Sequence, residues 1–198
     1  MHKNTSRLAT LSVLLVSATA AQAHTGHATS SLMEGLLHPA SGLDHLLAML
    51  AVGLWSASAL PAGNTWMGPA TFLAALAASA GLGLLGVAVP HLELLIALSV
   101  VLFGAMLVLP RQVLPTSVGL ALVAVAASLH GLAHGAEAPA SGWAAYATGF
   151  LFTTAGLHVA GVAAGLGIRT FLARQARWVM AGSGALLGSA GLYLATQI

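Results

Sequence analysis

Six long apolar stretches, separated by short breaks that contain proline, glycine or arginine, follow one another along most of this sequence. Each stretch approaches the ~20 residues that an α-helix needs to cross the hydrocarbon core of a bilayer. Charged residues make up only 5% of the chain, whereas soluble domains carry roughly 25% to hydrate their surfaces. We therefore expect an all-α integral membrane protein, a compact bundle of antiparallel helices joined by short connections. The six predicted transmembrane helices cover approximately residues 39–60, 66–89, 92–109, 113–134, 143–167 and 177–196.

The first residues have the features of a secretory signal peptide. Lys3 and Arg7 precede an apolar stretch at residues 8–20, and the segment from Ala21 to Ala23 has the small-x-small pattern of a cleavage site. We expect residues 1–23 to be removed after Ala23, which leaves a transmembrane permease domain at residues 24–198. The alternative is an uncleaved first helix, for which the apolar stretch is short.

The basic residues indicate the orientation of the helices. Cytoplasmic loops of membrane proteins carry an excess of arginine and lysine. After the predicted cleavage site, all basic residues lie in the third-to-fourth and fifth-to-sixth connections, at Arg111, Arg169, Arg174 and Arg177. A cleaved signal peptide also places these two connections on the cytoplasmic side. We predict a multi-pass protein of the bacterial inner membrane with both mature termini in the periplasm.

The remaining composition limits the partners. The formal charge of +2 comes from only six basic and four acidic residues, so the lipid bilayer is a predicted partner and nucleic acid is not. The chain has no cysteine, which excludes disulfides and thiolate metal sites. A homo-oligomer is left open.

The acidic residues and most of the histidines gather at the predicted periplasmic ends of the helices. His130 and His134 are four residues apart, which places them on one face of the fourth helix, and Glu137 continues that face if the helix extends. His38 and His45 are similarly aligned on the first helix, where Pro39 fits the first helical position. Gly42 would permit a close approach of another backbone.

Ionisable groups at membrane depth are functional candidates, because each is costly there unless it is paired or hydrated. Neutral imidazole together with carboxylate is a ligand set for Ni²⁺, Co²⁺, Zn²⁺ and Cu²⁺. The carboxylates could be ligands themselves or could orient the imidazole rings. The main candidate metal ligands are His38, Asp44, His45, His130, His134 and Glu137.

A second group of candidates has ordinary explanations that compete with metal binding. His24 and His27 form either a metal-collecting tail or a solvated terminus, and Glu34 lies within four residues of His38. His91 and Glu93 could be interfacial residues at the start of the third helix. His158, near the middle of the fifth helix, could be a packed histidine bonded to Thr153, Thr154 or a backbone carbonyl.

Two motifs resemble the signatures of the HupE/UreJ family of nickel/cobalt permeases. They are HPASGLDH at residues 38–45, which runs into LLAMLAVGLW, and HGLAHGAE at residues 130–137. HLELLIALSV (91–100) and TTAGLHVAG (153–161) also resemble family segments, and the signal peptide and six-helix layout match, so the resemblance covers essentially the whole chain. One departure is Leu129, where the family usually has phenylalanine; both residues are apolar.

The resemblance implies uptake of Ni²⁺, or of Co²⁺ in some members, to supply hydrogenase, urease or cobalamin pathways. It also implies that the six main candidate ligands carry the transport. We therefore expect a permease and not an enzyme, with no permanently bound cofactor and with the metal ion as its transported substrate. No GxxxxGK[ST] nucleotide-binding loop is present, which favours facilitated diffusion or transport driven by the membrane potential.

Two other classes of protein fit the same polar residues. An intramembrane zinc-dependent hydrolase would hold one tightly bound metal ion that activates water. A haem-binding bundle would use pairs of histidines as axial ligands.

Overall fold

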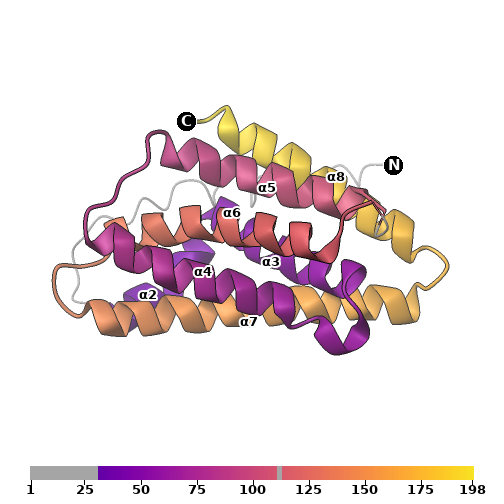
Figure 1. Ribbon diagram of the computed structural model, residues 1–198, viewed down its shortest axis with the longest axis horizontal. Helices are drawn as coiled ribbons and strands as arrows, with labels where there is room; N and C mark the ends of the chain where they lie inside the picture. Colours follow the sequence, from indigo (N-terminus) through magenta and orange to yellow (C-terminus); the bar gives the residue numbers. More distant parts are fainter. Residues whose placement is uncertain (1–30, 111–112) are drawn as a thin grey trace, which may run out of the picture.

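A computed structural model describes residues 31–110 and 113–198, and these residues form helices and connections with no strand among them. The predicted signal peptide, His24, His27 and Arg111 lie outside the described residues. The long helices α4 to α8 run roughly along one common direction (Figure 1). In chain order they are α2 (Ser31–Ser41), α3 (Leu43–Ala59), the short 3₁₀ helix η2 (Ala62–Asn64), α4 (Met67–Leu84), α5 (Leu92–Val108), α6 (Thr116–Ala136), α7 (Trp143–Phe171) and α8 (Ala176–Ala195).

The described residues confirm several membrane-crossing helices but do not confirm all six that were predicted. Four segments are long and apolar enough to cross a membrane: Ala62–Leu84, Thr116–Ala136, Trp143–Phe171 and Ala176–Ala195. A fifth is added if α2 and α3 form one bent span. α5 is apolar but has only 17 residues. The chain is therefore an all-helical, multi-pass membrane protein with four or five candidate spans by length and composition.

The first predicted span is wrong in one respect, because it is two helices and not one. α2 and α3 meet at an angle of 76°, and the break lies at Gly42, whose backbone is extended (φ −92°, ψ 121°). Pro39 lies inside α2 and not at a first helical position. Proline has no N–H to donate to the carbonyl four residues earlier, which weakens the helix just before the break.

The second predicted span also ends earlier than expected, at Leu84 instead of residue 89. Gly86 has a positive φ of 84°, its N–H donates to the Gly83 carbonyl at 2.9 Å, and the Val87 N–H donates to the Leu82 carbonyl at 3.1 Å. These two bonds form the Schellman motif that ends a helix.

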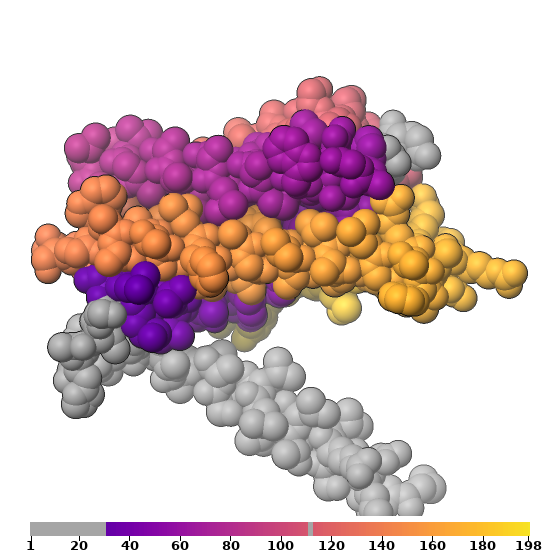
Figure 2. Space-filling model, turned by 90° about the horizontal axis from the view of Figure 1, so that it is seen from below, coloured from indigo at the N-terminus to yellow at the C-terminus, as the bar shows by residue number. Residues whose placement is uncertain are grey.

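The helices pack in pairs. α4 packs mainly on α6, α5 on α8 and α3 on α7, and Figure 1 shows α5 and α8 side by side along one edge. Glycine permits the close approach: a Cβ on Gly161 of α7 would lie 2.5 Å from the Leu50 carbonyl oxygen of α3. α2 packs against the first turns of α7 (Figure 2), where the Thr153 hydroxyl donates to the Leu36 carbonyl at 2.8 Å.

The two ends of the bundle carry opposite charges. All four acidic residues of the chain lie at or near the starts of α2, α3 and α5 and the end of α6, which we call the acidic end. The described arginines lie near the end of α7 and the start of α8, which we call the arginine end. Large apolar side chains such as Phe152, Val159 and Leu186 are exposed on the flanks between them, as expected of a surface that lipid covers.

The packing of α7 on α3 can be tested with two alanine substitutions on the same helix. Gly161→Ala places its Cβ against the α3 backbone, so we expect it to destabilise the protein by about 1–3 kcal/mol, as overpacking does. Gly156 has open space around its would-be Cβ, so Gly156→Ala should leave stability unchanged or slightly raised. Thermal unfolding of both variants in detergent checks this; equal melting temperatures would contradict the described contact.

Candidate metal-binding site

Four histidine rings form one contiguous group at the acidic end, which we call the imidazole cluster: His38, His45, His130 and His134. The ring centroids of His45 and His130 lie 4.6 Å apart, and those of His45 and His134 lie 4.9 Å apart. His38 contacts His134 at 4.9 Å and lies 6.3 Å from His45. The i, i+4 spacing on α6 and the break between α2 and α3 thus bring together all four histidines of the main candidate metal ligands.

The two carboxylates of the main candidate set, Asp44 and Glu137, each lie within hydrogen-bond distance of one of these rings. Asp44 Oδ1 accepts hydrogen bonds from His45 Nδ1 at 2.9 Å and from the His45 backbone N–H at 2.7 Å. Glu137 Oε2 lies 3.0 Å from His38 Nε2. The condition under which Glu137 would continue the face of α6 is not met, because the helix ends at Ala136 and Glu137 is its C-cap. From there the hydrogen bond to His38 lowers the pKa of Glu137 below its usual value.

These hydrogen bonds determine which ring nitrogen carries the proton in a neutral imidazole. A carboxylate can only accept, so His45 donates from Nδ1 and its Nε2 keeps a lone pair. His130 Nε2 lies 2.9 Å from Ser99 Oγ, and the Ser99 hydroxyl donates to the Ile96 carbonyl at 2.7 Å. Ser99 has only one proton to give, so His130 donates from Nε2 and keeps its lone pair on Nδ1.

His158 lies deeper in the bundle, and its hydrogen bond likewise determines which ring nitrogen carries the proton. Its Nδ1 lies 2.8 Å from the Thr154 carbonyl oxygen, which accepts the ring proton and leaves the lone pair on Nε2. The ordinary explanation considered for His158, a hydrogen bond to a neighbouring carbonyl, is therefore correct for one of its two nitrogens. The other nitrogen stays available.

The lone pairs of these rings have no partner. Within residues 31–110 and 113–198, several buried polar atoms make no hydrogen bond, although buried polar groups in proteins are normally satisfied. Leaving such a group unpaired costs about 1–3 kcal/mol. A polar ligand, either water or a cation, would relieve this cost. The atoms are His45 Nε2, His130 Nδ1, both ring nitrogens of His134, His158 Nε2, Tyr146 Oη and Thr154 Oγ1.

Aromatic side chains enclose the cluster, and the sequence analysis did not identify them. Phe150 stacks on His134 with centroids 4.6 Å apart and rings nearly parallel. Phe72 lies 5.6 Å from His130 and 4.8 Å from His158, so its ring connects the cluster with the deeper histidine. No local pattern distinguishes these phenylalanines from other core residues.

Tyr146 and Ser99 were also missed. Tyr146 is buried and its ring lies 5.6 Å from that of His38. Ser99 had a usable signal, since it is the only polar residue in the apolar stretch 94–108. A cavity of about 280 Å³ between α4, α6 and α7 lies beside the cluster, with His134, Tyr146 and Phe150 in its wall.

Three of the second group of candidates, His91, Glu93 and Glu34, lie at the acidic end and outside the cluster. His91 is the N-cap of α5, has a positive φ of 57° and is exposed. Glu93 is exposed in the first turn of α5, where its carboxylate interacts electrostatically with those of Glu137 and Asp44. Glu34 is exposed on α2. None of these three makes a ring contact or an ion pair with the cluster in the described part of the chain.

The cluster is not a closed metal site. Among the described residues, no group of three or more His, Asp or Glu side chains is arranged so that it could hold a metal ion as it stands. The rings instead meet edge to face. A metal ion would need the rings to rotate until their free nitrogens point at one position, each at a distance of about 2.0–2.1 Å from the ion.

The hydrogen bonds predict one fixed tautomer for each of three rings. We expect His45 and His158 to carry the proton on Nδ1 and His130 to carry it on Nε2. Long-range ¹H–¹⁵N NMR correlations of histidine-labelled protein at neutral pH, assigned with single His→Gln variants, measure this directly. Opposite tautomers, or rapid exchange between both forms, would contradict the described hydrogen bonds.

Comparison with known proteins shows the family to which the chain belongs. The family model described as HupE / UreJ protein matches residues 11–194. Protein HupE of Rhizobium leguminosarum bv. viciae is 39% identical to the chain over 158 residues, which cover 79% of this chain and 82% of that protein. No solved structure matches the chain. The chain therefore belongs to the HupE / UreJ family, a family of nickel and cobalt permeases and not of enzymes.

Proposed function

We propose that this protein takes up Ni²⁺, or Co²⁺, across the bacterial inner membrane, and that the imidazole cluster is its recognition site. The observation that carries the proposal is the set of buried imidazole lone pairs without a partner. Imidazole nitrogens suit Ni²⁺ and Co²⁺ as ligands. The hydrogen bonds that His45 donates to Asp44 and that His130 donates to Ser99 are the outer contacts that typically orient a metal-binding ring.

Helix ends support the attraction of a cation to this site. α2 ends at Ser41 and α6 at Ala136, and His38 and His134 lie in the last turns of these helices. The C-terminal end of a helix carries a partial negative charge that favours cations. The carboxylates of Asp44 and Glu137 add to this field.

The contacts suggest an order in which the ion meets its ligands. Glu137 and His38 are the more exposed pair and would meet the hydrated ion first. His45, His134 and His130 would then replace water molecules. The Phe72 ring stands between His130 and His158, so passage to the deeper histidine requires that ring to move. His158 Nε2 would receive the ion on the far side.

An incompletely formed site suits transport, because binding must be weak enough to permit release. The driving force in this proposal is the membrane potential or the concentration gradient of the ion. A potential of 100 mV is worth about 2.3 kcal/mol for each elementary charge, and hence about twice that for a divalent ion. No permanently bound cofactor takes part.

Several predictions from the sequence belong to this proposal. It includes cleavage of the signal peptide after Ala23, a permease domain at residues 24–198 with six spans, and both mature termini in the periplasm. The acidic end then faces the periplasm and the arginine end the cytoplasm. His24 and His27 would collect metal ions at the entrance. The physiological link is indirect, through the maturation of nickel enzymes, and a homo-oligomer is compatible with the proposal.

The alternative of an intramembrane zinc-dependent hydrolase is not favoured, because the chain belongs to a permease family. The haem-binding bundle is set aside for the same reason.

Transport measurements on three variants test the proposal. Purified protein in liposomes should take up Ni²⁺ or Co²⁺ in response to an inside-negative potential. His45→Ala and His134→Ala should each lower the initial rate by about tenfold or more, the lower end of the effect of disturbing a metal site. His91→Asn is the matched control, since His91 lies outside the cluster and asparagine tolerates its positive φ. The control should retain the wild-type rate.

Equal uptake by all variants at matched protein content would overturn the assignment of the site. Absence of uptake of either ion by the wild type would overturn the proposed function itself.

A further inference from the structure

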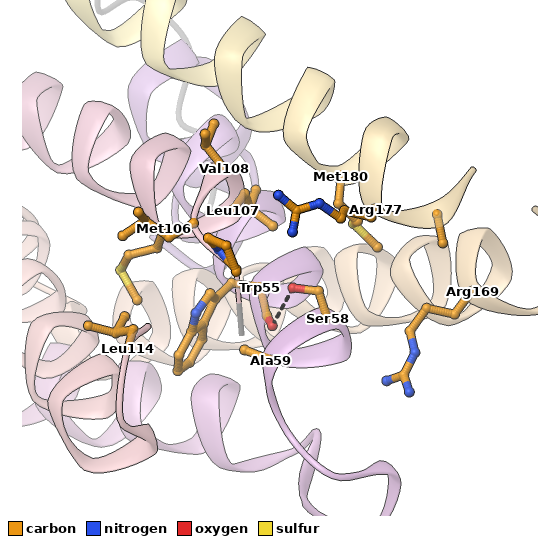
Figure 3. Close-up of a pocket in the computed structure, with 13 residues that line it drawn as sticks. Trp55, Ser58, Ala59, Met106, Leu107, Val108, Leu114, Arg169, Arg177 and Met180 are labelled. Atoms are coloured by element: carbon orange, nitrogen blue, oxygen red, sulfur yellow. Dashed lines mark hydrogen bonds between the residues drawn. The ribbon is translucent and has the colours of Figure 1, made fainter. Parts of the chain in front are cut away.

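A second cavity of about 280 Å³ (Figure 3) lies at the arginine end, and none of the four histidines of the imidazole cluster lines it. The ends of α3, α5 and α7 and the start of α8 form its walls. Most of the wall is apolar, and two guanidinium groups lie at the rim. The residues that matter here are Trp55, Met106, Leu107, Met180, Arg169 and Arg177.

Arg169 is held in place by a hydrogen bond to a carbonyl in the last turn of α3 that has no backbone N–H to pair with. The carbonyl of Ala57 would normally accept from the N–H of residue 61, but that residue is Pro61 and has no N–H. Arg169 donates to this carbonyl from its Nη1 atom. The bond uses one donor of a group that has five, so the rest of the guanidinium is free to bind a second partner at the rim of the cavity.

Arg177 lies in the first turn of α8, on the opposite side of the cavity. Its guanidinium extends toward Leu107 and Val108 of α5 (Figure 3), and its Cζ atom lies 5.9 Å from the ring of Trp178. The N-terminal end of a helix adds partial positive charge at such a position. The guanidinium groups of Arg169 and Arg177 therefore place formal positive charge on two sides of the cavity.

Neither arginine has a carboxylate to pair with. The sequence contains no Asp or Glu after Glu137, and the two ion pairs among the described residues both lie at the acidic end. A divalent cation would be repelled here, so this cavity is not a second metal site. The missing counter-charge must come from outside the chain, and it must be an anion.

We propose that this cavity binds an anionic phospholipid of the surrounding bilayer, with its phosphate between Arg177 and Arg169 and an acyl chain along the apolar wall. A basic pocket between transmembrane helices is a recognised type of site for anionic headgroups. The wall formed by Met106, Leu107 and Met180 suits an acyl chain and would be poor for a free, fully hydrated phosphate ion. Trp178, 73% exposed, and Phe171, 86% exposed, flank the site, as aromatic residues do at the membrane interface.

The test compares two arginines of the same connection. The full protein is reconstituted in vesicles of equal phosphatidylglycerol and phosphatidylcholine, re-extracted in mild detergent, and its retained lipid is quantified by mass spectrometry. The wild type should retain phosphatidylglycerol in preference to phosphatidylcholine. Arg177→Gln should lower this preference about fivefold, the effect expected of one basic group near the membrane surface. Arg174→Gln is the matched control, because Arg174 is exposed in the same connection and does not line the cavity; it should retain the preference.

Three results would overturn the proposal: no preference for phosphatidylglycerol in the wild type, equal losses in the two variants, or displacement of the retained lipid by millimolar inorganic phosphate. The second would indicate diffuse surface charge, and the third a site for free phosphate. The readout is retained lipid and not metal uptake, so its failure is separate from any failure of the proposed transport.

Discussion

A lone pair on a buried imidazole nitrogen costs stability when no other group binds it, and the acidic end of this protein holds several such lone pairs without a protein partner among the described residues. His45, His130 and His158 each use one nitrogen as a donor to a fixed partner and leave the other free. His134 has no partner for either nitrogen among the described residues. A chain that only needed packing would have apolar residues here, because each unpaired group costs stability. The arrangement becomes reasonable when a passing cation supplies the missing interaction.

The break between α2 and α3 makes this cluster possible. A continuous helix would keep His38 and His45 about two turns apart on one rod, whereas the 76° bend at Gly42 brings both rings to His134. The bend also exposes the N-terminal end of α3 to Asp44, where a negative charge is favoured. Broken helices of this kind commonly form the ion sites of transporters. At the opposite end, the arginines lack counter-charges within the chain, so the proposed cation site and the proposed anionic lipid site lie at opposite ends of the bundle.

Much of the fold could be predicted from the sequence, because long apolar stretches and short breaks are local properties. The bounds of α5, α6 and α8 agree closely with the prediction. The bend at Gly42 could not be predicted, since residues 39–60 form one mostly apolar stretch of the length of a single span and Pro39 also suits a helix start. For the site, spacing identified His130 and His134 as neighbours. The pairing of His38 with Glu137 depends on how α2 packs on α7, which no pattern within a single helix reveals. Phe72, Phe150 and Tyr146 were missed for the same reason.

The most direct test of the central claim is X-ray absorption spectroscopy at the nickel edge on the reconstituted protein loaded with one equivalent of Ni²⁺. The account predicts multiple-scattering features from more than one imidazole ring, and their loss in a His45→Ala, His134→Ala double variant. A nickel ion surrounded only by oxygen atoms, with no imidazole scattering in the wild type, would contradict the claim that the buried lone pairs of this cluster bind the transported metal.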